Sequence, residues 1–196
     1  MSKQVRKRKR ESGFSVVELC VAMAVLAIMA SIAIPGTSRW LPGYRIKSAA
    51  RDLYSNLQLA RLEAIRNNRD HAVIFNTGAG TYGIVSSGAD GDFGTADDPA
   101  PLKTVALSDY GSGTNFGTGN AGGPLDAVRG FDDSVTFQDT ADGVNVVIFN
   151  ARGMINPQTN TAGEVYISNQ RNQCLAVSVR QTGAVALRQW TGGAWN

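Results

Sequence analysis

The chain has 196 residues, of which 43% are hydrophobic, which is enough for one modest globular domain with an appendage. Of its 19 basic and 16 acidic residues, six bases and Glu11 lie in the first 13 positions, which leaves 13 bases and 15 acids elsewhere. This mildly acidic remainder argues against a nucleic-acid-binding domain, and two cysteines far apart in sequence exclude a disulfide framework.

An apolar segment follows the basic cluster over residues 14–34, and Glu18 is its only charged residue. As a helix this segment would be roughly 31 Å long, about one hydrocarbon thickness. The upstream Lys/Arg cluster places the N-terminus in the cytoplasm, so the remaining chain would face the periplasm or exterior. A cleaved secretory signal peptide, cut after residues 31–33, is the alternative. Two features count against it: Pro35 follows at once, and a mid-bilayer acid costs about 2.5–3.5 kcal/mol, less toward the edge.

A cut between Gly13 and Phe14 would explain why an acid, Glu18, lies in the apolar segment. The new α-amine on Phe14 would lie one helical turn from the Glu18 carboxylate. Charges tolerate apolar surroundings chiefly when they are paired, either within one chain or between packed neighbours. Glu18 is therefore predicted to set the register of an assembly.

The sequence GFSVVEL after a short basic leader, with Pro35 closing the apolar run, resembles the class III signal of type IV pilins and type II secretion pseudopilins. The resemblance implies that a prepilin peptidase cleaves after Gly13 and methylates the amine of Phe14, and that Glu18 guides subunit docking. It divides this end into a leader over residues 1–13 and a transmembrane, filament-core helix over 14–35. An uncleaved signal anchor is the alternative.

A second, amphipathic helical segment is predicted over residues 36–69. Pro35 and Pro42 are expected to kink the path into it, and Asn67 and Asn68 to end it. Small or apolar residues recur at intervals of three and four, the spacing of one helical face: Ile46, Ala50, Leu53, Leu57, Ala60 and Ala64. Basic residues on this segment would contact anionic lipid or acidic neighbours, or form a solvated face: Arg39, Arg45, Lys47 and Arg51.

Residues 70–196 change to the two-residue period of β-strands. A hairpin is predicted around Gly78 and Gly80, further strands over 102–108, 134–139, 145–150 and 164–168, and a closing hairpin that turns at residues 181–183. The predicted fold is α+β, a long N-terminal helix packed on an antiparallel sheet domain. The order of these elements, with LARLEAIRNN and IFNARGMINP, resembles the FimT/FimU and GspH branch of minor pilins and pseudopilins.

Two long loops interrupt the strands. The first contains a cluster of oxygen ligands that suits calcium, although Asp/Gly turns offer a simpler explanation and no EF-hand order is present: Asp90, Asp92, Asp97 and Asp98. The second, residues 110–123, is rich in glycine and is expected to be flexible.

Catalytic chemistry has little support, because His71 is the only histidine and the carboxylates lie in loops. DNA binding is also not expected. The DNA-uptake relatives carry a Gly-Arg-any-Arg motif in the closing hairpin, whereas residues 183–186 here read GAVA, flanked by Arg180 and Arg188.

The sequence thus predicts a non-enzymatic minor type IV pilin without a cofactor, which primes or completes a pilus. It would sit in the inner membrane of a bacterium with its domain in the periplasm, and then join the filament. The expected partners are the prepilin peptidase, other pilins and the inner-membrane assembly platform. A type II secretion minor pseudopilin and a signal-anchored periplasmic binding domain are the alternatives.

Overall fold

The computed structural model describes residues 13–89, 91, 93, 98–125, 131, 133–137, 145–155 and 162–196, and the side chains of residues 32–39 lie outside this description. The chain divides into two compact units, Met1–Trp40 and Leu41–Asn196, and each is described by itself. One helix, α1 (Val16–Asn67), contributes to both units.

Within the second unit, α1 presents one buried face. All six residues of the predicted apolar stripe are at most 1% exposed, and Ala49 joins them, so this part of the prediction is confirmed. Four of the seven are alanines, whose small side chains let a helix and a sheet approach closely. The helix ends at Asn67, as expected, because Asn68 adopts a left-handed conformation with φ 48° and Arg69 N donates to Ala64 O at 3.2 Å.

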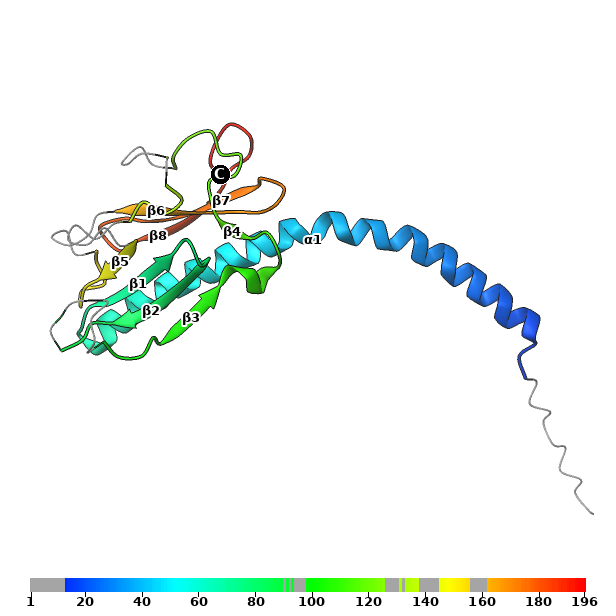
Figure 1. The fold of residues 1–196 in the computed structure, drawn as a ribbon, viewed down its shortest axis with the longest axis horizontal. Helices are drawn as coiled ribbons and strands as arrows, with labels where there is room; N and C mark the ends of the chain where they lie inside the picture. The colour runs from blue at the N-terminus through cyan, green and yellow to red at the C-terminus, as the bar shows by residue number, and fades with distance from the viewer. Residues whose placement is uncertain are drawn as a thin grey trace, which may run out of the picture. The chain divides into compact units, whose positions relative to one another are not determined.

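The strands form two antiparallel sheets of four strands each, rather than the single sheet predicted from the sequence. The first has the order β3-β2-β1-β5, with β1 (His71–Asn76), β2 (Thr81–Ser86), β3 (Lys103–Ala106) and β5 (Val146–Phe149). The second has the order β4-β6-β7-β8, with β4 (Asn115–Phe116), β6 (Gly163–Ser168), β7 (Cys174–Val179) and β8 (Val185–Gln189). A 3-10 turn, η1 (Leu107–Tyr110), follows β3. Figure 1 shows the later part of α1 running alongside the strands of both sheets.

One hydrophobic core joins the helix to both sheets. It includes Leu53 and Leu57 from α1, Val73 from β1 and Val177 from β7, all with no exposed area. Phe75 of β1 links the sheets directly, since its ring meets Phe116 of β4 edge-on at a centroid distance of 6.0 Å. The apolar stripe of α1 is therefore buried by strands from two separate sheets.

The glycine-rich segment 110–123 differs from its prediction as a flexible loop. Its residues Asn115 and Phe116 form β4, which pairs with Ser168 and Ile167 at the edge of the second sheet. Asn120 N also donates to Asn172 O at 2.7 Å. Glycine content alone predicted flexibility, whereas long-range backbone pairing orders this segment.

Candidate functional site

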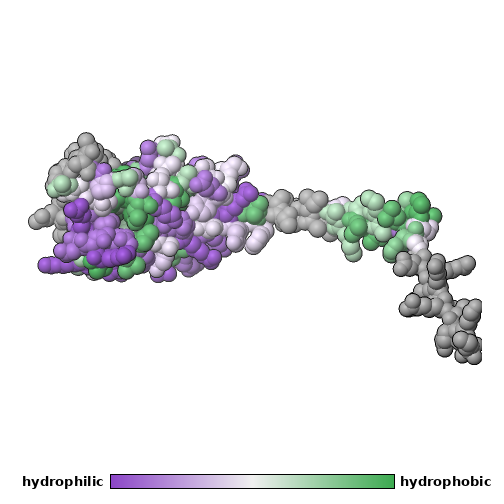
Figure 2. Space-filling model, turned by 90° about the horizontal axis from the view of Figure 1, so that it is seen from below, coloured by the Kyte–Doolittle hydropathy of each residue, from purple (hydrophilic) through white to green (hydrophobic). Residues whose placement is uncertain are grey.

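The apolar helix at the N-terminus is the first candidate site. Phe14 is 84% exposed and precedes α1, which begins at Val16 with a hydrogen bond from Leu19 N to Ser15 O of 3.1 Å. The large apolar side chains along this part of α1 are all exposed: Val16, Val17, Leu19, Val21, Met23, Val25, Leu26, Ile28 and Met29. Figure 2 shows this segment as a stretch of hydrophobic surface. A continuous apolar surface of this kind is typical of a site that contacts a membrane or another protein.

Glu18 lies in the first turn of α1, four residues after Phe14. An acid in this position is favoured by the free N–H groups at a helix start. Gly13 lies before the helix, and a Cβ added there would meet no heavy atom within 4 Å. The fold therefore places no steric demand on Gly13, so a requirement for glycine would come from an enzyme that reads this position.

Two family models match this chain, one at the N-terminal helix and one over the globular unit. The model of the prokaryotic N-terminal methylation motif matches residues 8–34, and that of the type II transport protein GspH matches residues 49–183. The chain belongs to the GspH family. The resemblance of GFSVVEL to a class III signal is thereby confirmed, and so is the assignment to the FimT/FimU and GspH branch.

Solved structures also resemble this GspH-family chain. The minor pseudopilin EpsH from the type II secretion system of Vibrio cholerae has 14% identity and a TM-score of 0.47, over 73% of this chain and 95% of that one. The type IV minor pilin FimU of Pseudomonas aeruginosa has 20% identity and a TM-score of 0.46, over 83% and 97%. No curated protein sequence matches significantly.

Part of the predicted N-terminal site lies outside the described residues. The leader is described only at Gly13, and no side chain is described over residues 32–39, which include Pro35. Among the described residues, no helix combines the length and the apolar character that a membrane crossing requires. The cleavage site, the methylation of Phe14, the docking role of Glu18 and the kinks at Pro35 and Pro42 stay predictions.

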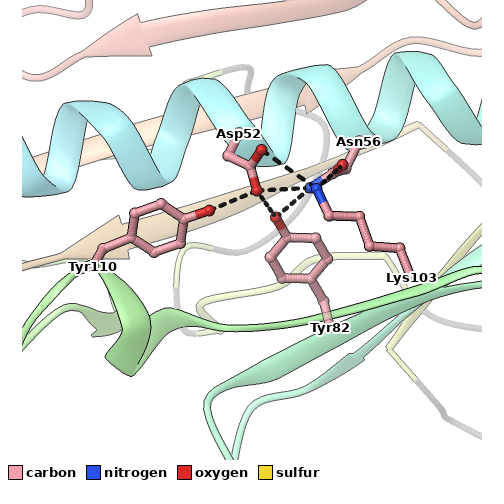
Figure 3. Close-up of polar contacts among 5 residues, drawn as sticks. All are labelled: Asp52, Asn56, Tyr82, Lys103 and Tyr110. Carbon is pink, nitrogen blue, oxygen red and sulfur yellow. Dashed lines mark hydrogen bonds and ion pairs between the residues drawn. The ribbon is translucent and has the colours of Figure 1, made fainter.

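A polar network between α1 and the first sheet is a feature that the sequence analysis missed. Asp52 Oδ2 accepts hydrogen bonds from the hydroxyls of Tyr110 at 2.6 Å and Tyr82 at 3.3 Å, and from Asn56 Nδ2 at 2.9 Å. Lys103 Nζ lies 3.5 Å from Asp52 Oδ1 and donates to Asn56 Oδ1 at 2.9 Å. Figure 3 shows these side chains converging from α1, β2, β3 and η1. The network thus ties the helix to three other elements.

The protonation properties of this network fit a structural role. Burial favours the protonated form of Asp52, but the hydrogen bond from Tyr110 and the charge of Lys103 outweigh it, so the pKa of Asp52 is lowered. Burial raises the pKa of both Tyr82 and Tyr110, and the neighbouring Asp52 adds to the effect. Asp52 is therefore held ionised and the two phenols are held neutral, an arrangement that favours hydrogen bonds from the phenols to the carboxylate.

His71 and the two cysteines have structural environments. His71 is 4% exposed, with Nδ1 3.1 Å from Arg69 O and Nε2 3.4 Å from Asn67 Nδ2, which agrees with the expected structural histidine. Cys20 and Cys174 are free thiols. Burial raises the pKa of Cys174 to about 12, so it is not a thiolate at neutral pH.

The predicted calcium ligands fall mainly on residues that the structure does not describe, namely Asp90, Asp92 and Asp97. Asp98 is described, and its Oδ1 accepts a hydrogen bond from Gly88 N at 3.1 Å within the same loop. No group of three or more metal-ligating side chains occurs among the described residues. Calcium binding here stays a prediction.

Proposed function

We propose that this GspH-family chain is a minor type IV pilin, a subunit that primes or completes a filament after removal of residues 1–13. The observation that carries the proposal is the arrangement of α1. This one helix carries the methylation motif on a fully exposed apolar segment and then supplies the buried face of a GspH domain. Such a chain joins an exposed helical segment suited to filament assembly directly to a folded GspH domain.

The physical role of the N-terminal helix follows from its exposure. Its apolar side chains are covered by lipid before assembly and by the helices of neighbouring subunits afterwards, so filament formation exchanges one apolar surrounding for another. The charge of Glu18 is tolerated in that surrounding when it meets the methylated amine of Phe14 on a neighbouring subunit. Glu18 therefore selects one axial register among many apolar contacts of similar energy.

The remaining parts of the proposal follow from this assignment. The chain acts without catalysis, and its partners are the prepilin peptidase, the other pilins and the inner-membrane assembly platform. It is anchored in the inner membrane, with the GspH domain in the periplasm, until it enters the filament. The methylation motif supports an anchored, processed subunit over a signal-anchored periplasmic binding domain.

A second candidate function is a minor pseudopilin of type II secretion, which the match to the family of the type II transport protein GspH favours. The two candidates share the processing and docking steps and differ in the filament that is built. Deletion of the gene distinguishes them, because loss of surface pili supports the pilin and loss of protein secretion with intact pili supports the pseudopilin.

Glu18→Ala in the full chain tests the docking step. The variant should insert into the membrane at least as well as the original, because an expensive charge leaves the apolar segment. Its amount in purified filaments, measured by immunoblot against the membrane fraction, should fall about tenfold or more, since one buried charge pair contributes on the order of 1.5 kcal/mol. Glu63→Ala, in the later part of the same helix, where the Glu63 side chain is 19% exposed and pairs with Arg66, is the matched control. Equal incorporation of the Glu18 variant and the control would refute the pairing.

A further inference from the structure

A groove of about 220 Å³ lies between α1 and β8 in the globular unit. Leu175 and Leu187 provide its apolar lining, and Gln189 and Asn196 add polar atoms. Its remaining lining residues are all basic: Lys47, Arg51 and Arg188. Lys47 and Arg51 come from α1, whereas Arg188 follows Leu187 in β8 and so projects from the other face of the sheet. The groove thus places basic residues on a domain whose residues after position 71 include 6 basic and 11 acidic ones.

These three cations have no hydrogen-bond or ion-pair partner in the part of the chain that the structure describes. By contrast, Lys103 pairs with Asp52 and Arg66 pairs with Glu63. Lys47 and Arg51 are four residues apart, so they lie on the same side of α1 with a rise of about 6 Å between them. A cluster of like charges without counter-charges attracts an anionic partner.

The groove also contains an open sheet edge. β8 ends its sheet and pairs with β7 only. Trp190 N donates to Cys174 O, toward β7, whereas Gln189 N donates to Asn196 O at 2.8 Å on the outer side. By the alternation of an antiparallel strand, the N–H and C=O of Leu187 also point outward, and they have no partner among the described residues. Asn196 pairs with Gln189 in both directions, so the chain itself covers the edge at Gln189 and the open part of the edge lies at Leu187.

We propose that this groove binds an extended acidic segment of another protein chain by adding a strand to β8. The backbone of that segment pairs with Leu187, while alternate carboxylates on the face toward α1 meet Lys47 and Arg51. The spacing agrees, because alternate side chains of a strand are about 6.6 Å apart, close to the rise between Lys47 and Arg51. The proposal rests on the proposed function only in naming a neighbouring filament subunit as the source of this segment.

A peptide fits this groove better than a nucleic acid does. The outward edge of Leu187 offers both a donor and an acceptor, and a peptide backbone satisfies both, whereas a phosphate would be repelled by the carbonyl oxygen. The leucine side chains in the lining also suit the apolar residues of a strand and contribute nothing to phosphate contacts.

The test uses the full chain in an uncharged detergent and fluorescence anisotropy of a labelled peptide of alternating Val and Glu. We expect saturable binding that weakens about fivefold or more in Lys47→Gln and in Arg51→Gln, and that decreases with added salt. Arg180→Gln, an exposed base just before the turn of the same hairpin, is the control and should leave binding unchanged. The same peptide methylated on its backbone nitrogens should bind more weakly, because it can no longer donate to the β8 edge.

Four outcomes would overturn the proposal: equal binding of a Val/Lys peptide, an equal effect of Arg180→Gln, no effect of backbone methylation, or no binding up to about 1 mM. Displacement of the peptide by a short DNA duplex at lower concentration would assign the groove to nucleic acid instead. None of these results depends on processing at Gly13 or on filament formation, so failure here is distinguishable from failure of the proposed function.

Discussion

The carboxylate of Asp52 on α1 receives polar side chains from three other elements, β2, β3 and η1. A charged acceptor with donors from Tyr82, Tyr110 and Lys103 makes stronger hydrogen bonds than a neutral one. Sequence reasoning missed this network because its members lie up to 58 positions apart. The available signal was local: Asp52 and Asn56 are polar residues at helical spacing beside the apolar stripe.

Replacing Asp52 by Asn keeps the shape of the side chain and removes its charge. We expect the free energy of unfolding to fall by about 1–3 kcal/mol, because hydrogen bonds to a charged group are weakened and Lys103 loses its counter-charge. Urea denaturation of the full chain in uncharged detergent measures this change. Glu63→Gln, which breaks an ion pair to an Arg66 side chain that is 79% exposed, should cost less than about 0.5 kcal/mol. Equal losses would show that the network does not stabilise the fold.

The lowered pKa of Asp52 also predicts how the stability of the fold depends on pH. The folded-state pKa of Asp52 is lowered from 3.8, so its contribution to stability is present above that value and is lost as the pH falls through the folded-state pKa. Asp70 acts in the opposite direction, because burial raises its pKa. The Asp52→Asn variant should therefore lose less stability than the original chain on acidification below about pH 4. Parallel denaturation curves over this range would contradict the assignment.

At the scale of elements, the buried stripe of α1 was fully predictable, since the three-and-four spacing of apolar residues identified every member except Ala49. The β1–β2 and β7–β8 hairpins were predictable from turn residues and alternation. The strand β4 was not, because a two-residue strand in a glycine-rich segment is defined by its partner β6 and not by its own sequence. The separation into two sheets was missed for the same reason, since period alone does not say which strands pair.

Leu57→Ala and Leu62→Ala test the orientation of α1 with the same substitution on opposite faces. Leu57 has no exposed area, whereas Leu62 is 60% exposed. The first change should lower the free energy of unfolding by about 2–5 kcal/mol through lost burial and a cavity, and the second by less than about 0.5 kcal/mol. Thermal or urea unfolding of both variants gives the comparison. A larger loss for Leu62→Ala would mean that this face of the helix is covered.

At the scale of the whole molecule, the chain combines a GspH-family domain with an exposed apolar helical segment. The sequence predicted this division, because charge, hydropathy and the GFSVVEL motif are all local features. It did not predict the groove beside β8. Lys47 and Arg51 were recognised as basic residues on a helix and Arg188 as a residue near a turn, and only the fold brings these three together.

The proposed function requires that the mature chain begin at Phe14 and be built into a filament. Mass spectrometry of the intact protein recovered from filaments tests this directly. The claim predicts a chain that lacks residues 1–13 and carries one added methyl group on the Phe14 amine. A Gly13→Val control should remain full length, because the larger side chain would block the peptidase, whereas the fold itself leaves room for it. Recovery of a functional filament protein that retains residues 1–13, or of a Gly13→Val chain with the same mature mass, would contradict the account.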